Sequence, residues 1–176
     1  MGDLLNIYNL IKEEEQQIEL QKYKIFCDID GVLADFDERF DYFAGISPKM
    51  YKSQYGKKKF WNLINDAGAG FWIGMKWMSD GKKLWNYIQK YTPTLLSAPS
   101  NESSSRFGKR EWVDTHLPGV KLILSKAHDK KNYSGRSHIL IDDRVSNVQD
   151  WIAAGGIGIL HTSTDDTINQ LQKLGL

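Results

Sequence analysis

Acidic side chains stand at the ends of two apolar stretches of the sequence. In IFCDIDG, Asp28 and Asp30 directly follow a short apolar run, and in HILIDD the run ends in Asp142 and Asp143. Carboxylates at the end of a core strand are costly unless something there neutralises them. Their placement therefore indicates a site that uses negative charge.

The four carboxylates point to a bound cation. If they converged without one, they would repel one another and raise one another's pKa values. The candidate ligands are all oxygens, with no clustered His or Cys, which favours a hard ion such as Mg²⁺. Ser97 ends another apolar run, and Lys130 and Lys131 precede HILIDD. A hydroxyl and a lysine beside Mg²⁺ suit a phosphoryl group, whose charged oxygens need neutralising.

Asp28 and Asp30 have the spacing for two-step phosphoryl chemistry. A carboxylate can attack phosphorus and form an aspartyl-phosphate that water later hydrolyses, which makes Asp28 the candidate nucleophile. Asp30 is then the candidate general acid and base, and Gly31 allows the sharp turn that brings both groups over one phosphate. For DIDG alone, a simple turn is the alternative. An EF-hand is excluded because the Gly and Glu of the later loop positions are missing.

Five short strands must position these residues. The apolar runs are KIFCDI, PTLLSA, VKLILS, HILIDD and GIGILH, each apolar on successive residues, as expected when both faces of a sheet are covered. Helical patterns lie between and after them, around Leu84, around Trp112, from Val145 to Ile152 and from Thr164. This alternation predicts an α/β fold with a parallel sheet, whose strand ends form the ligand-binding edge.

Residues 36–77 interrupt the alternation with a segment too long for a simple connection. We expect a small, mainly helical cap inserted after the first strand. The spacing of Leu4, Ile7, Leu10 and Ile11 also predicts an amphipathic helix over residues 3–21. The predicted organisation is an N-terminal helix (1–22), a core (23–35 and 78–176) and a cap (36–77).

The composition of the chain limits the classes of binding partner and the cellular location that we expect. The chain of 176 residues is 41% hydrophobic and has a formal net charge of +1, so bulk charge calls for neither a long nucleic acid nor a membrane surface. Cys27 is the single cysteine and lies in an apolar run, which indicates a reduced core residue. The N-terminus has neither the apolar core of a signal peptide nor the composition of a transit peptide. We therefore expect a cytoplasmic location.

Four motifs carry a family resemblance: DIDGVLADF, LLSAPS, KAHDKKNYSG and ILIDDR. In this order they resemble the haloacid dehalogenase-like (HAD) superfamily of phosphotransferases, over residues 24 to about 162. Within it, DIDGVLADF and GKREWVDTHLPG are most similar to the 5'(3')-deoxyribonucleotidases. The resemblance implies a HAD-like Rossmannoid three-layer sandwich with a five-stranded parallel sheet and a helical cap.

The resemblance also implies roles for individual residues. Asp28 would be the nucleophile, and Asp30 the acid and base as well as a metal ligand through its backbone. The other implied roles are metal contact for Asp143, support of the metal site for Asp142, and phosphate binding for Ser97, Ala98 and Lys130 or Lys131. Lys130 is favoured of the two lysines because it follows Asp129, as the family's lysine follows an acid.

One departure concerns the phosphate site. Ser100 and Asn101 stand where the family has a basic residue shortly after the second motif. The phosphate affinity or the substrate size would therefore differ from the family's.

Aromatic residues of the cap are candidates for substrate selection. Phe71 and Trp72, with Phe43 and Trp61 behind them, could stack on a nucleobase. The alternative is that these rings build the cap's own small core.

Together these features predict a Mg²⁺-dependent phosphomonoesterase that acts on a small molecule, above all a deoxynucleoside monophosphate. The alternatives are a HAD phosphatase for a sugar phosphate or a nucleic-acid-end phosphate, and a non-catalytic binding module with this fold. The oligomeric state, including a homodimer, is left open.

Overall fold

The computed structural model describes residues 5–8, 10–12 and 22–176 of the chain. Its centre is a five-stranded sheet with strand order β3-β2-β1-β4-β5, in which every neighbouring pair is parallel. The strands are β1 (Lys24–Cys27), β2 (Thr94–Ser97), β3 (Leu122–Leu124), β4 (His138–Asp142) and β5 (Ile157–Leu160). The predicted α/β fold with a five-stranded parallel sheet is thus confirmed.

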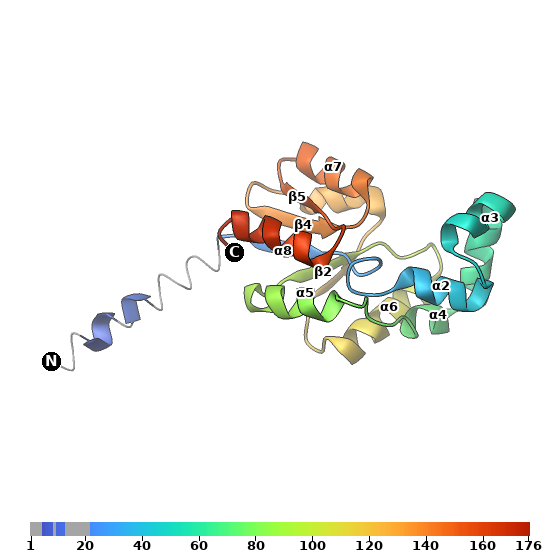
Figure 1. Ribbon diagram of the computed structural model, residues 1–176, viewed down its shortest axis with the longest axis horizontal. Helices are drawn as coiled ribbons and strands as arrows, with labels where there is room; N and C mark the ends of the chain where they lie inside the picture. The colour runs from blue at the N-terminus through green and yellow to red at the C-terminus, as the bar shows by residue number, and fades with distance from the viewer. Residues whose placement is uncertain (1–4, 9, 13–21) are drawn as a thin grey trace.

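Helices cover both faces of the sheet (Figure 1). On one face lie α5 (Gly81–Ile88), α6 (Ser103–His116) and α8 (Thr164–Lys173), with the short η1 (Gln89–Tyr91) after α5. On the other lie η2 (Ala127–Tyr133) and α7 (Val145–Ala153). The chain therefore changes face where it crosses from β3 back over the sheet to β4.

Strand β1 shows why these runs are apolar on successive residues. Ile25 and Cys27 pack into the core on the α5 face, whereas Phe26 packs on the opposite face against Trp151 of α7, with ring centroids 5.2 Å apart. All three strand residues are at most 1% exposed. A strand buried on both sides has no polar face, so its apolar pattern is continuous.

Between β1 and α5 the chain inserts three helices, α2 (Phe36–Ala44), α3 (Pro48–Asp66) and α4 (Ala69–Ile73). They project from one end of the sheet (Figure 1), and α4 packs against α6. Gly108 makes this approach possible because a Cβ there would lie 2.6 Å from Trp72 Cβ and 2.8 Å from the Ala69 carbonyl oxygen. The helical insertion after the first strand is confirmed, and its treatment as a separate unit with bounds 36–77 stays a prediction.

The predicted N-terminal helix is described only in part. Residues 5–8 and 10–12 are helical, and Leu5 and Leu10 are exposed. The rest of the predicted segment lies outside the described residues. Among the residues that the structure describes, no helix combines the length and the apolar character needed to cross a membrane.

Candidate active site

The loop after β1 places Asp28 and Asp30 at the carboxyl edge of the sheet. Asp28 directly follows the strand, and its Oδ1 accepts a hydrogen bond of 2.8 Å from the backbone N–H of Ile29. The chain then turns tightly, and the N–H groups of Leu33 and Ala34 both bond the carbonyl of Ile29. The turn brings the backbone at Gly31 against the end of β4.

Lys130 links the ends of β1 and β4. It is fully buried, and its Nζ lies 2.8 Å from Asp28 Oδ2 and 2.7 Å from Asp142 Oδ2. Lys131 is exposed instead. Of the two lysines that the sequence left eligible, Lys130 is therefore the one that the fold places beside the candidate nucleophile.

Lys109 of α6 is a site residue that the sequence analysis missed. Its side chain is fully buried. Its Nζ donates to both carboxylate oxygens of Asp30 at 2.6 Å and to Ser97 Oγ at 3.1 Å. The ammonium group also lies 4.6 Å from the centre of the Trp72 ring. The sequence did contain an indication that Lys109 is buried, because it shares a helix face with the buried Trp112 three residues later.

Asp142 is fixed by neighbours on α7. It is fully buried, and its Oδ1 accepts hydrogen bonds from the Arg144 N–H at 2.9 Å and from Asn147 Nδ2 at 3.0 Å. Asn147 was also missed by the sequence analysis. Its position five residues after Asp142, in the first turn of the next helix, is the feature that could have suggested it.

The carboxylates of Asp28, Asp142 and Asp143 converge, with ligand oxygens within 4.8 Å of one another. When all are ionised, these three and Asp30 carry four negative charges, against two positive charges on Lys109 and Lys130. In that state the site has two uncompensated negative charges, which a divalent cation would balance. Oxygen donors alone fit a hard ion such as Mg²⁺, so the residues present suit the ion that the sequence predicts.

The aspartates differ in their tendency to hold a proton. Asp143 is exposed as a residue, but the partial burial of its carboxyl raises its pKa to about 7, together with the negative charges of Asp28, Asp142 and Asp30. Burial acts the same way at Asp28, but the positive charges of Lys130 and Lys109 outweigh it and lower the pKa of that residue. Burial raises the pKa of Asp30 despite Lys109. Asp28 is thus kept ionised, as a nucleophile needs, and Asp30 is the better proton carrier.

The remaining predicted site residues lie at different depths. Ser97 is fully buried and bonded to Lys109, and Ala98 follows it at the end of β2, half-buried. Phe71 and Trp72 are buried within the insertion, where both pack against Phe36. A base could stack on them only if the inserted helices moved.

The two other predicted rings are more accessible. Trp61 is half-buried and contacts Phe60, with ring centroids 5.1 Å apart. Phe43 is 40% exposed. Their part in substrate binding stays a prediction.

Comparisons with known proteins agree with this fold. No family model matches the chain. A protein of Vibrio phage KVP40 with the name "Putative 5'(3')-deoxyribonucleotidase" is 26% identical over 149 residues, which cover 82% of this chain and 80% of that protein.

Two solved structures share the architecture. A hydrolase from Streptococcus pneumoniae TIGR4 superposes with a TM-score of 0.54 at 15% identity, covering 89% of this chain and all of that one (100%). A HAD-superfamily hydrolase from Ehrlichia chaffeensis gives a TM-score of 0.53 at 12% identity, covering 87% and 97% of the two chains. The chain therefore has the fold of the haloacid dehalogenase-like hydrolases, and it is a distant relative of a phage protein that bears a deoxyribonucleotidase name.

Proposed function

We propose that this chain is a Mg²⁺-dependent phosphomonoesterase that works through an aspartyl-phosphate on Asp28. One observation carries the proposal: the Asp28 carboxylate lies beside the Lys130 ammonium group, at 2.8 Å, and within the cluster that Asp142 and Asp143 complete. The groups that we propose as nucleophile, phosphate-binding cation and ligands of a divalent ion thus lie at one edge of the sheet. Asp30, two residues on, adds a proton carrier.

In the first step, an Asp28 oxygen attacks phosphorus and the ester P–O bond breaks. The departing oxygen takes a proton from Asp30, whose pKa is raised by burial. Lys130 binds the negatively charged phosphoryl oxygens, and Ser97 and Lys109 lie on the other side, where they bond each other and Lys109 bonds Asp30. Mg²⁺ held by Asp28, Asp142 and Asp143 would neutralise phosphate charge when bound.

In the second step, water attacks phosphorus and the bond to Asp28 breaks. Asp30, now a carboxylate, accepts the proton of the water, which restores both residues and releases inorganic phosphate. The same group acts as acid and then as base, so a single well-placed carboxyl suffices for both steps. The contact with Lys109 holds that carboxyl in place throughout.

We propose a deoxynucleoside monophosphate as the substrate. The name of the phage relative and the motifs DIDGVLADF and GKREWVDTHLPG support this choice. A sugar phosphate and a phosphate at the end of a nucleic acid use the same chemistry and are the alternatives. A non-catalytic binding module is disfavoured because Asp28, Asp30 and Asp143 are all present.

A phosphate-release assay tests the proposal. We expect release from dUMP and dTMP with Mg²⁺, little release with EDTA, and slower release from sugar phosphates and from oligonucleotides that carry a terminal phosphate. Asp28→Asn removes the nucleophile with little change of shape and should abolish turnover. Asp150→Asn, at an exposed position of α7, is the matched control and should keep full activity. Turnover that survives in Asp28→Asn would exclude the aspartyl-phosphate mechanism.

A further inference from the structure

The inserted helix α3 presents a strongly basic surface that the proposed phosphatase chemistry does not use. Between Asp41 and Asp66 the sequence contains no acidic residue and five lysines: Lys49, Lys52, Lys57, Lys58 and Lys59. All five are exposed. Within the part of the chain that the structure describes, none of them forms an ion pair with a carboxylate. The chain as a whole is nearly neutral, so this positive charge is local.

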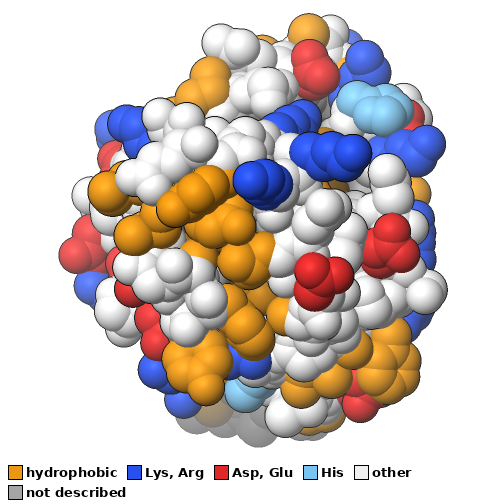
Figure 2. Space-filling view, turned by 90° about the vertical axis from the view of Figure 1, so that its right-hand side faces the viewer, with side chains coloured by type: hydrophobic (Ala, Val, Ile, Leu, Met, Phe, Trp, Pro, Cys, Tyr) orange, Lys and Arg blue, Asp and Glu red, His pale blue; other side chains and the backbone are white. Residues whose placement is uncertain are grey.

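Two of these lysines lie beside aromatic rings, the buried Phe60 and the exposed Tyr55. Lys52 Nζ lies 4.1 Å from the centre of the Phe60 ring, and Lys59 Nζ lies 5.8 Å from that of Tyr55. Gly56, with φ 82° and ψ 162°, breaks the helical backbone between the two groups of lysines. Figure 2, which faces the end of the molecule that carries α3, shows Lys and Arg side chains beside an exposed hydrophobic area.

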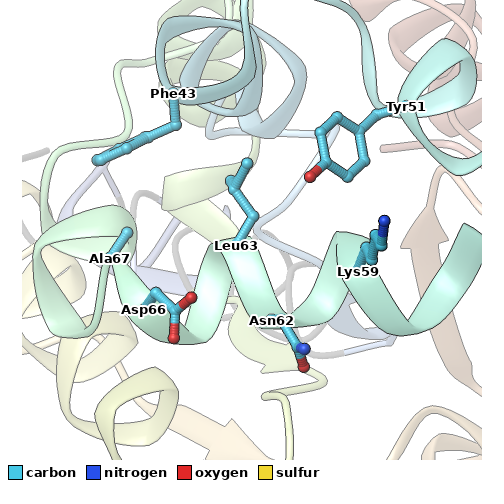
Figure 3. Close-up of a pocket in the computed structure, with 7 residues that line it drawn as sticks. All are labelled: Phe43, Tyr51, Lys59, Asn62, Leu63, Asp66 and Ala67. Carbon is cyan, nitrogen blue, oxygen red and sulfur yellow. The ribbon is translucent and has the colours of Figure 1, made fainter. Parts of the chain in front are cut away.

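A cavity of about 500 Å³ opens in the same part of the insertion. Phe43 of α2 and Tyr51 at the start of α3 flank it, with Leu63 between them (Figure 3). The other lining residues are Lys59, Asn62, Asp66 and Ala67. The cavity thus combines two aromatic side chains with the ammonium group of Lys59, the amide of Asn62 and the carboxylate of Asp66.

This combination of aromatic side chains and lysines suits a single-stranded nucleic acid, in which flat bases are joined by anionic phosphates. Bases stack on aromatic side chains whatever their identity, and lysines beside them neutralise the phosphates. An anionic membrane would also attract a polybasic helix, but it would not account for an open pocket flanked by two aromatic side chains. We infer that the cavity flanked by Phe43 and Tyr51, with the lysines of α3, binds a short segment of single-stranded nucleic acid.

The charge of this surface continues toward the sheet. Partial burial lowers the pKa of Lys52, and the nearby positive charges of Arg144 and Lys57 lower it further, against the opposing effect of Asp37. Arg144 directly follows Asp143 at the end of β4. The binding that we propose does not depend on catalysis at the candidate active site.

Fluorescence polarisation with a labelled oligo(dT) of about 12 nucleotides, within the range bound by small single-strand sites, tests the inference. We expect the full chain to bind at about 50 mM salt and to lose affinity as salt rises. The variant K57A/K58A/K59A should bind at least about tenfold more weakly. Its slope of log affinity against log salt should also become shallower by about 2, because each of the three lost phosphate contacts contributes about 0.7 to the slope.

The matched control removes three exposed lysines elsewhere, Lys82, Lys90 and Lys173, and should bind like the wild-type chain. A second pair of variants tests the ring: Tyr51→Ala should weaken binding by about tenfold, whereas Tyr51→Phe, which keeps the ring face, should not. Oligo(U) in a parallel titration separates a preference for RNA from one for DNA. Circular dichroism of each variant verifies that the insertion stays folded.

Three results would overturn the inference: no binding of oligo(dT) or oligo(U), equal loss in the two triple-lysine variants, or binding only to phosphatidylserine vesicles. Asp28→Asn separates this inference from the proposed function, because it should retain full oligonucleotide affinity. If the phosphatase proposal fails while this binding persists, the inference stands on its own.

Discussion

Lys109 Nζ lies 2.6 Å from both carboxylate oxygens of Asp30, and the contact joins a helix on the sheet to the loop after β1. A buried lysine needs such a partner because an isolated ammonium group would be costly in the interior. The contact also fixes the carboxyl that we propose as acid and base. We therefore expect stability and the proposed catalysis to be coupled at this pair.

Replacing Lys109 by Met should impair both properties. The change keeps a long apolar stem but leaves Asp30 and Ser97 without their partner, so we expect a loss of about 3 kcal/mol in the free energy of unfolding. Phosphate release should fall at least about 100-fold, as when one preorganised charge is removed. Urea denaturation and the phosphate assay measure the two effects.

Arg110→Met is the control for this prediction. Arg110 is the next residue of α6 and is exposed, so its loss should change stability by less than about 0.5 kcal/mol. A Lys109→Met protein with normal turnover would show that Asp30 needs no such support.

Lys130 and Lys131 should respond very differently to the same substitution. Lys130→Met removes the cation between Asp28 and Asp142, which should destabilise the protein by about 3–5 kcal/mol and reduce turnover at least about 100-fold. Lys131→Met changes an exposed side chain and should be nearly neutral. Equal effects in thermal melts and phosphate assays would mean that the geometry around Asp28 differs from the one described.

Asp143 should make the metal-free protein sensitive to pH. Its pKa is about 7 in the folded protein and near 3.8 when unperturbed, so the folded state holds the proton more tightly. Stability then falls as pH rises from about 4 to 7, and the penalty is complete above 7. In EDTA at pH 8, the free energy of unfolding of Asp143→Asn should exceed that of the wild type by about 1 kcal/mol. This figure is reduced for solvent screening, because the carboxyl is partly exposed. The difference should vanish at pH 4.

With Mg²⁺, the wild type should become the more stable of these two proteins. Added ion stabilises a folded protein that binds it, so the wild-type melting temperature should rise with Mg²⁺ concentration while that of Asp143→Asn stays nearly constant. Calorimetry at pH 8 with and without Mg²⁺ measures both. An equal rise in the two proteins would place the ion away from Asp143.

The site residues at the strand ends were predictable, because each is a polar residue at the point where an apolar run ends. Asp28, Asp142 and Ser97 each follow an apolar run, and parallel strands bring their carboxyl ends to one edge whatever the loops do. Lys109 was not predictable, because a lysine inside a helix is usually exposed and its burial depends on tertiary contacts with Asp30, Ser97 and Trp72. Asn147 was missed for a similar reason, because its hydrogen bonds to Asp142 depend on the position of the first turn of α7.

The sequence predicted a small, mainly helical insertion over residues 36–77 but not which of its aromatic rings face outward. Phe71 and Trp72 lie together on the short helix α4, and both are buried, Phe71 against Phe36 and Phe43 of α2 and Trp72 against Phe36 and α6. Phe43 stays accessible because it lies near the end of α2, beside the cavity. Such outcomes depend on how three short helices pack, which a pattern of residue types does not determine.

The close approach of Gly31 to Asp143 gives the last prediction. Gly31 has φ 74°, and a Cβ there would lie 2.6 Å from Asp143 Oδ2. Gly31→Ala should therefore push the Asp143 carboxyl away from Asp28 and abolish both the Mg²⁺-dependent rise in melting temperature and most of the phosphate release.

Gly119→Ala separates this displacement from backbone strain. Gly119 has a similar φ of 81°, but no described atom lies within 4 Å of the Cβ position. Both substitutions should cost about 1 kcal/mol in stability from the left-handed backbone, and only Gly31→Ala should lose the response to Mg²⁺. If the two variants behave alike in calorimetry, the contact between Gly31 and Asp143 does not shape the ion site, and the cluster that supports the proposed chemistry must tolerate movement of Asp143.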